Sequence, residues 1–251
     1  MRITSLKIPT SKAEAATLGC ESQLGLNDGS GLSGLLSLLN FNLQDLVSPS
    51  PDGTIPSLLI GEVSGWDYEQ TDQQVAALGL RIYGLANQTL TGSMSLSSDS
   101  VPVYDATASI NCDQLSSSLA PLHFDVPLLT EEHTTRLALQ HAHLTGKMRT
   151  NDLSLERATL NGYLSRADLR EVIVGLQTAC SSETPPELCG IDNPILEVDA
   201  DALVDLMAST ILGGFDSRVD NGVASTCAGP SCNAVSVCIA VETESVAVRT
   251  E

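Results

Sequence analysis

Aromatic side chains are scarce in this chain. They make up 3% of its 251 residues, whereas 42% of the residues are hydrophobic. The length suits one large domain, whose core must then be built from Leu, Val, Ile and Ala. The scarcity also leaves few flat rings on which a sugar could stack. Trp66 and Tyr68, beside Asp67 on a loop after a predicted strand, form the best candidate pair for a carbohydrate ligand.

Basic residues are scarce too. The chain has 12 Lys and Arg against 31 Asp and Glu, which gives a net charge of -19. An acidic surface repels phosphate backbones and anionic headgroups, so we expect neither nucleic acid nor electrostatic docking to lipid. The negative electrostatic potential of such a surface favours binding of cations or of a basic protein instead.

Long apolar runs are missing. No stretch reaches the roughly 18 apolar residues that span a bilayer, so we expect no membrane span. The first twelve residues, M-R-I-T-S-L-K-I-P-T-S-K, are weakly basic but carry no apolar segment. We therefore find no signal peptide in this chain.

Familiar catalytic motifs are missing as well. The chain has no G-x-S-x-G elbow, no Walker loop and no G-x-G-x-x-G turn. Among 31 acidic residues, some pair would meet the spacing of glycosidase carboxylates by chance. We predict a non-enzymatic protein, with a hydrolase built on two close carboxylates as an alternative.

Cysteine, in contrast, is well represented, with seven residues. Cys180 and Cys189 bracket a loop with two prolines, and Cys227 and Cys232 bracket A-G-P-S. These turn-forming segments hold each pair of ends close, so we predict two local disulfides. Stable disulfides need an oxidising compartment, which predicts an extracytoplasmic protein and a chain that is a fragment or has a misassigned start. A cytosolic protein with seven reduced cysteines is the rival interpretation.

Three cysteines remain, namely Cys20, Cys112 and Cys238. At most two of them can pair with each other, so one is free or bonds to another chain. The sequence leaves their pairing open.

Hydrophobic periodicity predicts the fold. Residues 1–24 lack periodicity and are expected to be an irregular lead-in to one β-rich domain over 25–251. Leucines at helical spacing predict a helix over 32–46. Strands are predicted over 57–66, 75–85, 88–96, 101–110, 121–128, 134–149, 153–164 and 234–249, the last as a strand or a hairpin. Two further helices are expected to begin at a capping box, Ser165 with Asp168, and at Asp199 or Asp201.

Many short strands separated by turn residues favour an antiparallel sandwich or barrel. We predict a mainly β, antiparallel two-sheet sandwich. One N-terminal helix and two helices in the C-terminal half would cover an edge or an open end.

A short pattern, Leu-polar-Gly-x-apolar, occurs three times, beginning at Leu90, Leu144 and Leu160. In a strand its Leu, Gly and last apolar residue share a face. The glycine is expected to leave room for a large side chain from a facing element.

Two groups of residues are candidate metal ligands. His141 and His143 lie two apart on a predicted strand, so both rings project from one face and suit a transition metal. Asp216, Asp220 and Asn221, in D-S-R-V-D-N-G, resemble part of a calcium loop, although Arg218 stands where a ligand is expected. The alternatives are a polar strand face and an Asx/Gly turn. We expect no cofactor, with calcium as the alternative; Asn27-Asp28-Gly29 is a weaker candidate for a calcium site than Asp216 to Asn221.

Four segments carry a family resemblance: N-D-G-S-G-L-S-G-L-L-S-L-L-N, P-S-L-L-I-G-E-V-S-G-W-D, A-T-L-N-G-Y-L-S-R-A-D-L and N-A-V-S-V-C-I-A-V-E. Over roughly 24–250 the chain resembles a family of uncharacterised exported proteins from myxobacteria and related proteobacteria. Family members often carry a D-x-D-x-D-G run, which is degenerate here at Asn27 and near Asp216. The resemblance implies an extracytoplasmic location.

These observations together predict a non-enzymatic structural, adhesive or scaffold module of the cell envelope. Its partner would be an unidentified protein or cell-surface component. A cation-dependent, carbohydrate-binding sandwich is the alternative.

Overall fold

The computed structural model describes the chain apart from residues 21–32, 35, 37–41, 68–73, 90–93, 98, 129, 150–153, 183–184, 186–188, 190–197, 211, 213, 221–222, 247 and 251. In the described part the protein is mainly β, with four helices. The helices are α1 (Lys12–Leu18), α3 (Leu43–Val47), α4 (Arg166–Cys180) and α5 (Ala200–Thr210).

The main sheet contains eleven of the described strands. They are β1 (Arg2–Lys7), β2 (Thr54–Ser64), β3 (Gln74–Thr89), β5 (Tyr104–Asn111), β6 (Gln114–Ser117), β7 (Ala120–Leu128), β8 (Thr130–Arg149), β9 (Ser154–Ser165), β10 (Ser217–Asp220), β11 (Val223–Thr226) and β12 (Ala234–Glu244). A separate two-stranded sheet pairs β4 (Met94–Leu96) with β13 (Val248–Thr250).

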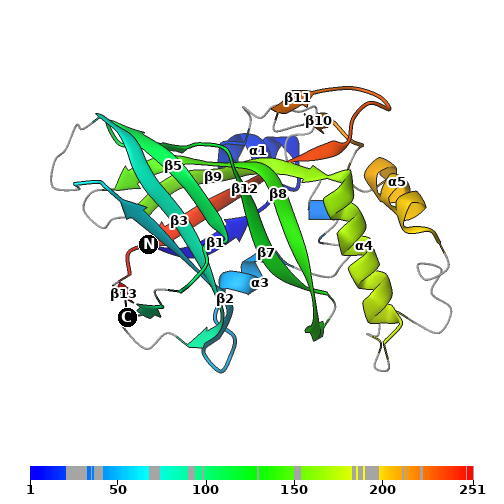
Figure 1. The fold of residues 1–251 in the computed structure, drawn as a ribbon, viewed down its shortest axis with the longest axis horizontal. Coiled ribbons are helices and arrows are strands. Elements are labelled where there is room, and N and C mark those ends of the chain that lie inside the picture. The colour runs from blue at the N-terminus through cyan, green and yellow to red at the C-terminus, as the bar shows by residue number, and fades with distance from the viewer. Residues whose placement is uncertain are drawn as a thin grey trace.

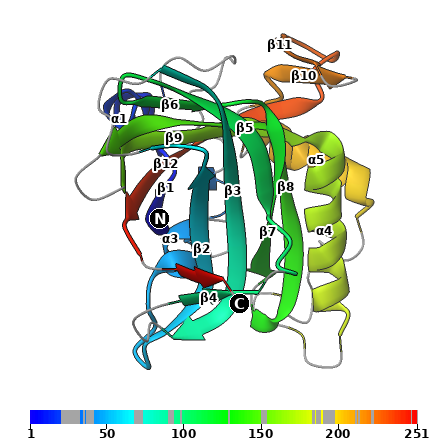
Figure 2. The ribbon, with the colours of Figure 1, turned by 60° about the vertical axis from the view of Figure 1, so that its left-hand side comes forward.

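The main sheet closes on itself. Its strands follow one another antiparallel in the order β1, β2, β3, β5, then β6 and β7 in one position, then β8, β9 and β12. β1 then pairs with β12 as well as with β2, which completes the ring seen in Figures 1 and 2. The predicted antiparallel β architecture is confirmed, but one closed sheet takes the place of the two-sheet sandwich. The alternation of apolar and polar residues along a strand cannot distinguish a closed sheet from a two-sheet sandwich, because both architectures bury one face of each strand.

Side chains fill the inside of this ring. Val235, Val237, Ile239 and Val241 alternate along β12, and each is at most 3% exposed. Because side chains in a strand alternate between faces, these four share one face. They belong to a single apolar core that also includes side chains of β1, β3, β8, α4 and α5.

The N-terminal segment is not an irregular lead-in, so this prediction is wrong for the described residues before 21. β1 forms the closing strand of the sheet, with Leu6 opposite Val241. α1 begins at the N-cap Ser11, whose side chain accepts a hydrogen bond from the Glu14 amide, and ends at Gly19 with φ +84°. The β1 strand is only six residues long, which is too short for a window-based periodicity to detect.

The later helices begin where the sequence predicts. The Ser165–Asp168 capping box of α4 is present, with each side chain bonding the backbone amide of the other residue. Asp199 rather than Asp201 caps α5, because Asp199 Oδ1 accepts from the amides of Asp201 and Ala202. α4 and α5 pack on each other beside β8 (Figure 1). α3 occupies the end of the helix predicted over 32–46; most of the remainder lies outside the described residues.

The glycines of the Leu-Gly pattern have a different role from the predicted one. Gly146 and Gly162 lie beside β-bulges, where the register between β8 and β9 shifts. A Cβ on Gly146 would lie 2.8 Å from the Cβ of Ala158, and one on Gly162 would lie 3.3 Å from a backbone oxygen of β8. The space is therefore needed by the neighbouring strand, not by a large side chain from a facing element. The copy at Leu90 lies partly outside the described residues.

Tyr104 supplies a buried polar anchor at the start of β5. Its hydroxyl lies 2.6 Å from Ser117 Oγ and donates to backbone carbonyls of Ser118 and Ala142, each at 3.2 Å. Tyr104→Phe should lower the free energy of unfolding by about 1–2 kcal/mol, because buried acceptors lose their donor. Tyr83→Phe, which removes an exposed contact with Glu62, should cost less than about 0.5 kcal/mol. Urea unfolding measures both, and equal losses would contradict the anchor.

Candidate functional site

Three disulfides join the described cysteines. Cys180–Cys189 and Cys227–Cys232 form as the sequence predicts. The third bond, Cys20–Cys238, ties the segment after α1 to the outer face of β12 across 218 positions of sequence. Cys112 is free and exposed. The open question of the three remaining cysteines is thus resolved in favour of one internal bridge.

The Cys20–Cys238 bridge lies in a small core of its own. Both cysteines and Ala15 are 0% exposed, and Leu18 packs against them. Because the inner-facing residues of β12 contribute to the main core, this small core lies on the opposite face of the strand. The bridge therefore pins α1 against the outside of the closed sheet.

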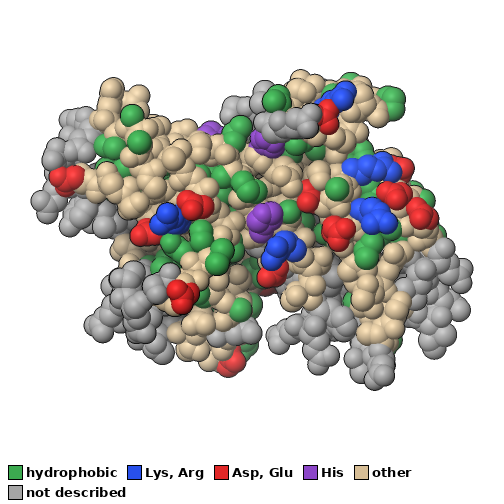
Figure 3. Space-filling model, viewed as in Figure 1, with side chains coloured by type: hydrophobic (Ala, Val, Ile, Leu, Met, Phe, Trp, Pro, Cys, Tyr) green, Lys and Arg blue, Asp and Glu red, His purple; other side chains and the backbone are tan. Residues whose placement is uncertain are grey.

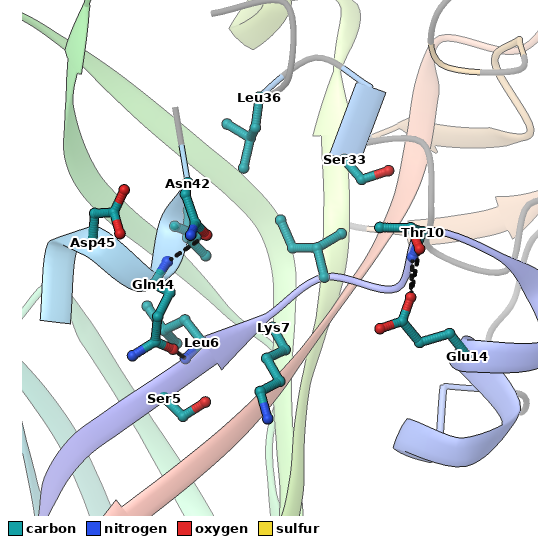
Figure 4. Close-up of a pocket in the computed structure, with 12 residues that line it drawn as sticks. Ser5, Leu6, Lys7, Thr10, Glu14, Ser33, Leu36, Asn42, Gln44 and Asp45 are labelled. Carbon is teal, nitrogen blue, oxygen red and sulfur yellow. Dashed lines mark hydrogen bonds between the residues drawn. The ribbon is translucent and has the colours of Figure 1, made fainter. Parts of the chain in front are cut away.

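The first hollow lies between β1, α1 and α3. It has a volume of about 970 Å³, and its lining combines apolar side chains of β1 and α3 with Lys7, Glu14 and Asp45. Figure 4 shows Glu14 on α1 apart from Asp45 on α3, with β1 passing between them. Hydrogen bonds from the hydroxyl of Thr10, and secondarily from its backbone amide, lower the pKa of the Glu14 carboxyl. Glu14 thus acts locally as a helix N-terminal acceptor.

Gln44 fixes the position of α3 in this hollow. Its Oε1 accepts from the Leu6 amide at 3.0 Å, and its Nε2 donates to the Thr4 carbonyl at 3.0 Å and to Ser48 Oγ at 2.9 Å. Figure 4 shows the first of these contacts. The side chain of Gln44 thus links α3 to the backbone of β1 by two hydrogen bonds.

An apolar cavity remains inside the closed sheet. Its volume is about 30 Å³, and it is lined by inward side chains of β1, β2, β9 and β12 together with Leu43 and Leu46 of α3. A space of this size holds one or two small molecules such as water, and an apolar lining gives water no partner. The interior is therefore a packed core rather than a ligand chamber.

The second large hollow, which we call the α1 groove, lies on the outer side of the sheet. It has a volume of about 880 Å³. Its walls are residues 16–19 of α1, residues 154–159 of β9, residues 240–243 of β12, and Gln114, Thr145, Gly146 and Arg149 of β6 and β8. Thr145 and Thr159 lie side by side in it, with 3.0 Å between their hydroxyl oxygens.

A row of polar side chains continues from this groove across β6, β8 and β9. His143 Nε2 lies 3.1 Å from Ser116 Oγ, and His143 pairs across the strands with Asn161. Asn161 is 6% exposed, and its Nδ2 donates to Thr159. Its Oδ1 has no hydrogen-bond partner in the described structure.

Burial lowers the pKa of His143 below its usual value of 6.5. The folded state therefore binds fewer protons at this imidazole than the unfolded state does. As the pH falls from about 6.5 toward the folded pKa, unfolding takes up a proton and stability is lost. We expect His143→Gln to weaken this loss, so that the advantage of the native protein over the variant grows from pH 5 to pH 7.5 and then levels off. Urea unfolding midpoints across that range measure it; parallel pH profiles would contradict it.

The predicted histidine pair is brought together only in part. Both residues lie on β8, but His141 has φ +52° at the bulge and its ring packs edge-on against Tyr163. His143 faces Ser116 instead. Among the described residues, no group of three or more His, Cys, Asp or Glu side chains is placed to hold a metal ion.

The two predicted calcium ligands that the structure describes, Asp216 and Asp220, have separate hydrogen-bonding partners. Asp216 is 2% exposed, and its carboxylate accepts hydrogen bonds from the amide and hydroxyl of Ser236 and from the Ser217 hydroxyl. Asp220 pairs with Arg218. Asn221 and Asn27-Asp28-Gly29 lie outside the described residues. These hydrogen bonds connect Asp216 to Ser217 of β10 and to Ser236 of β12, so the carboxylate joins the two strands. Calcium binding stays a prediction.

The predicted aromatic pair is described only at Trp66. This side chain is partly buried and packs against the main core, and Tyr68 lies outside the described residues. Core packing accounts for Trp66 without a ligand.

Most described cations lie next to carboxylates. Arg81 pairs with Asp105 at 3.3 Å, and Arg166 of α4 pairs with Asp205 of α5. Figure 3 shows this intermixing on one face, where blue side chains adjoin red ones. An acidic chain thus uses its few cations to neutralise local repulsion.

Comparison of the chain with protein-family models, with curated proteins and with solved structures finds no match. None of the described helices is long and apolar enough to cross a membrane.

Two features of the outer face escaped sequence reasoning. The Cys20–Cys238 bridge joins positions with no common motif, and no local signal marks their proximity. The backbone of Arg157 in β9 has φ +50°, a conformation that residues other than Gly, Asn and Asp rarely adopt. An arginine in the sequence gives no signal that the backbone at its position is left-handed.

Proposed function

We propose that this chain is a non-enzymatic structural or adhesive module of the cell envelope that works outside the cytoplasm. The observation that carries the proposal is the Cys20–Cys238 bond. It links the N-terminal segment to the last long strand, and both cysteines are fully buried. Such a bond forms as the chain folds, which requires an oxidising compartment.

The shape of the core supports a structural role. The closed sheet leaves few unpaired strand edges, and its interior is filled by aliphatic side chains apart from about 30 Å³. A packed, cross-linked body of this kind presents a fixed outer surface to a partner. Its strong negative charge favours a basic protein or a cationic component of the cell surface as that partner.

The oxidation state can be measured on protein isolated from its own cells. The protein is denatured in an alkylating reagent without reductant, and modified cysteines are counted by mass spectrometry. We expect one modified cysteine, Cys112, with the other six protected. Seven modified cysteines would reject the extracytoplasmic assignment.

The adhesive role needs a second measurement. The purified, oxidised chain is mixed with sedimented cell envelopes from the same cells, and with liposomes made from their extracted lipids. We expect the chain to sediment with the envelopes and not with the liposomes, because the acidic surface has no affinity for anionic lipid. Absence from the envelope pellet would reject adhesion while leaving the compartment intact.

A further inference from the structure

The strand β11 forms a free edge of the main sheet. Among the described residues it pairs only with β10, and β10 joins β12 outside the ring that β1 closes. Figures 1 and 2 show this β10–β11 hairpin projecting beyond the closed sheet, with β11 on its outer side. The side of β11 that faces away from β10 is therefore open to a partner.

The backbone groups on this open side belong to Ala224 and Thr226. On the other side of the hairpin, the Asn233 side chain accepts from the Val219 amide at 2.8 Å and donates to the Val219 carbonyl at 3.0 Å. Val219 stands opposite Ala224 in the register, so its backbone groups point away from β11. Because bonded and non-bonded pairs alternate along an antiparallel ladder, the amides and carbonyls of Ala224 and Thr226 point outward. We call these four groups the β11 edge.

The β11 edge lacks the usual protection against strand pairing. Exposed edges are normally blocked by charged side chains, by proline or by a covering element. The strand V-A-S-T has neither charge nor proline, and Val223 is 67% exposed. The Asn233 hydrogen bonds on one side and the Cys227–Cys232 bond directly after the strand hold β11 in place without a partner. An incoming strand therefore meets a preorganised edge, which lowers the entropy cost of binding.

Charge and size favour a basic segment over a second copy of this chain. Two copies would each carry a net charge of -19 and would repel one another. Two four-residue strands would also bury far less than the roughly 1,200 Å² of a stable interface. A basic segment is attracted by the same field, and main-chain hydrogen bonds supply the affinity when a strand is added to an edge.

We propose that the β11 edge binds an extended basic segment of a partner protein, which adds to the sheet as a further strand. The lysines or arginines of the segment are attracted by the negative charge of the chain, and an apolar side chain packs beside Val223. The inference rests on the proposed function, because it specifies how the envelope partner is recognised.

The probe is a fluorescently labelled peptide, K-V-K-V-K-V-K, and its binding to the oxidised full chain is measured by fluorescence anisotropy. The control peptide has the same sequence and charge, but every internal amide is N-methylated and cannot donate to a neighbouring strand. We expect the control to bind at least about fivefold more weakly, because the hydrogen bonds of the added strand are lost.

Ala224→Pro removes an outward amide without removing a hydrogen bond to β10. It should weaken binding of the unmodified peptide at least about fivefold. It should leave Tm within about 2 °C of the native value, because the pairing inside the hairpin is kept. Ala224→Ser is the matched control, since it keeps the amide, and it should bind as the native chain does.

Amide hydrogen exchange followed by NMR locates the contact on the native chain. The peptide should slow exchange at Ala224 and Thr226 and leave Ser225, whose amide faces β10, unchanged. Unchanged exchange at all three residues, equal binding of the two peptides, or native-like binding by Ala224→Pro would overturn the proposal. Dimerisation of the native chain that Ala224→Pro abolishes would assign the edge to a second copy instead. None of these results affects the cysteine count or the envelope sedimentation of the native chain, so failure here and failure of the proposed function are distinguishable.

Discussion

Replacing both Cys20 and Cys238 with alanine is expected to lower the free energy of unfolding by about 5 kcal/mol. The bond closes a loop with a sequence separation of 218, and the loss of unfolded-state entropy grows with the logarithm of loop length. The unfolded chain without the bond should also expose more surface. The dependence of the unfolding free energy on denaturant, the m-value, should therefore increase. Guanidinium unfolding of the oxidised protein yields both quantities.

Two other cysteine variants serve as controls. Replacing Cys227 and Cys232 with alanine opens a loop with a separation of five and should cost only about 2 kcal/mol. Replacing Cys112, which is exposed and unbonded, should change stability by less than about 0.5 kcal/mol. If the Cys20/Cys238 variant were no less stable than the Cys227/Cys232 variant, the long bridge would not be the main covalent constraint of the fold.

The long bridge also illustrates what a sequence can and cannot reveal. The short disulfides were predictable because proline and glycine between Cys227 and Cys232 force the chain to turn back within a few residues. The partner of Cys20 depends on how β12 meets α1, which is a property of the closed sheet. No local pattern encodes a contact between segments so far apart in sequence.

For strands and helices too, features with local causes are predictable from the sequence and long-range pairings are not. The capping box at Ser165 and the alternation from Val235 to Val241 have local causes, and both are confirmed. The closure of the sheet depends on the pairing of β1 with β12, in which a six-residue strand is placed by partners more than 230 positions away. The predicted two-sheet sandwich therefore included long strands such as β8, β9 and β12 but lacked β1, the strand whose pairing closes the sheet.

The candidate site was less predictable than the fold. Sequence reasoning selected His141 and Asp216 because of their ligand chemistry, but the bulge turns the first toward Tyr163, and burial commits the second to Ser236. The α1 groove instead combines ordinary residues such as Thr145 and Arg157, whose types carry no motif. Only the register of β8 against β9 brings them together.

That register depends on Gly146, and Gly146→Ala is expected to destabilise the fold by about 3 kcal/mol. The added Cβ would lie 2.8 Å from the Cβ and 3.0 Å from the Cα of Ala158, so part of the clash is with backbone that cannot rotate away. Overpacking of a rigid interior costs about 1–3 kcal/mol, and the backbone contact puts this site at the upper end. Urea unfolding measures the change.

A second substitution distinguishes the clash from a general intolerance of the strand. Ala158→Gly removes the nearer of the two opposing atoms, so the double variant Gly146→Ala/Ala158→Gly should be more stable than the sum of the single changes by at least about 1 kcal/mol. Gly61→Ala is the matched control, because its nearest neighbour is the flexible end of Met1 at 3.5 Å, and it should cost less than about 1 kcal/mol. Strict additivity at Gly146 and Ala158 would show that the glycine is required for another reason. The packing of β8 against β9, and with it the floor of the α1 groove, would then need a different physical basis.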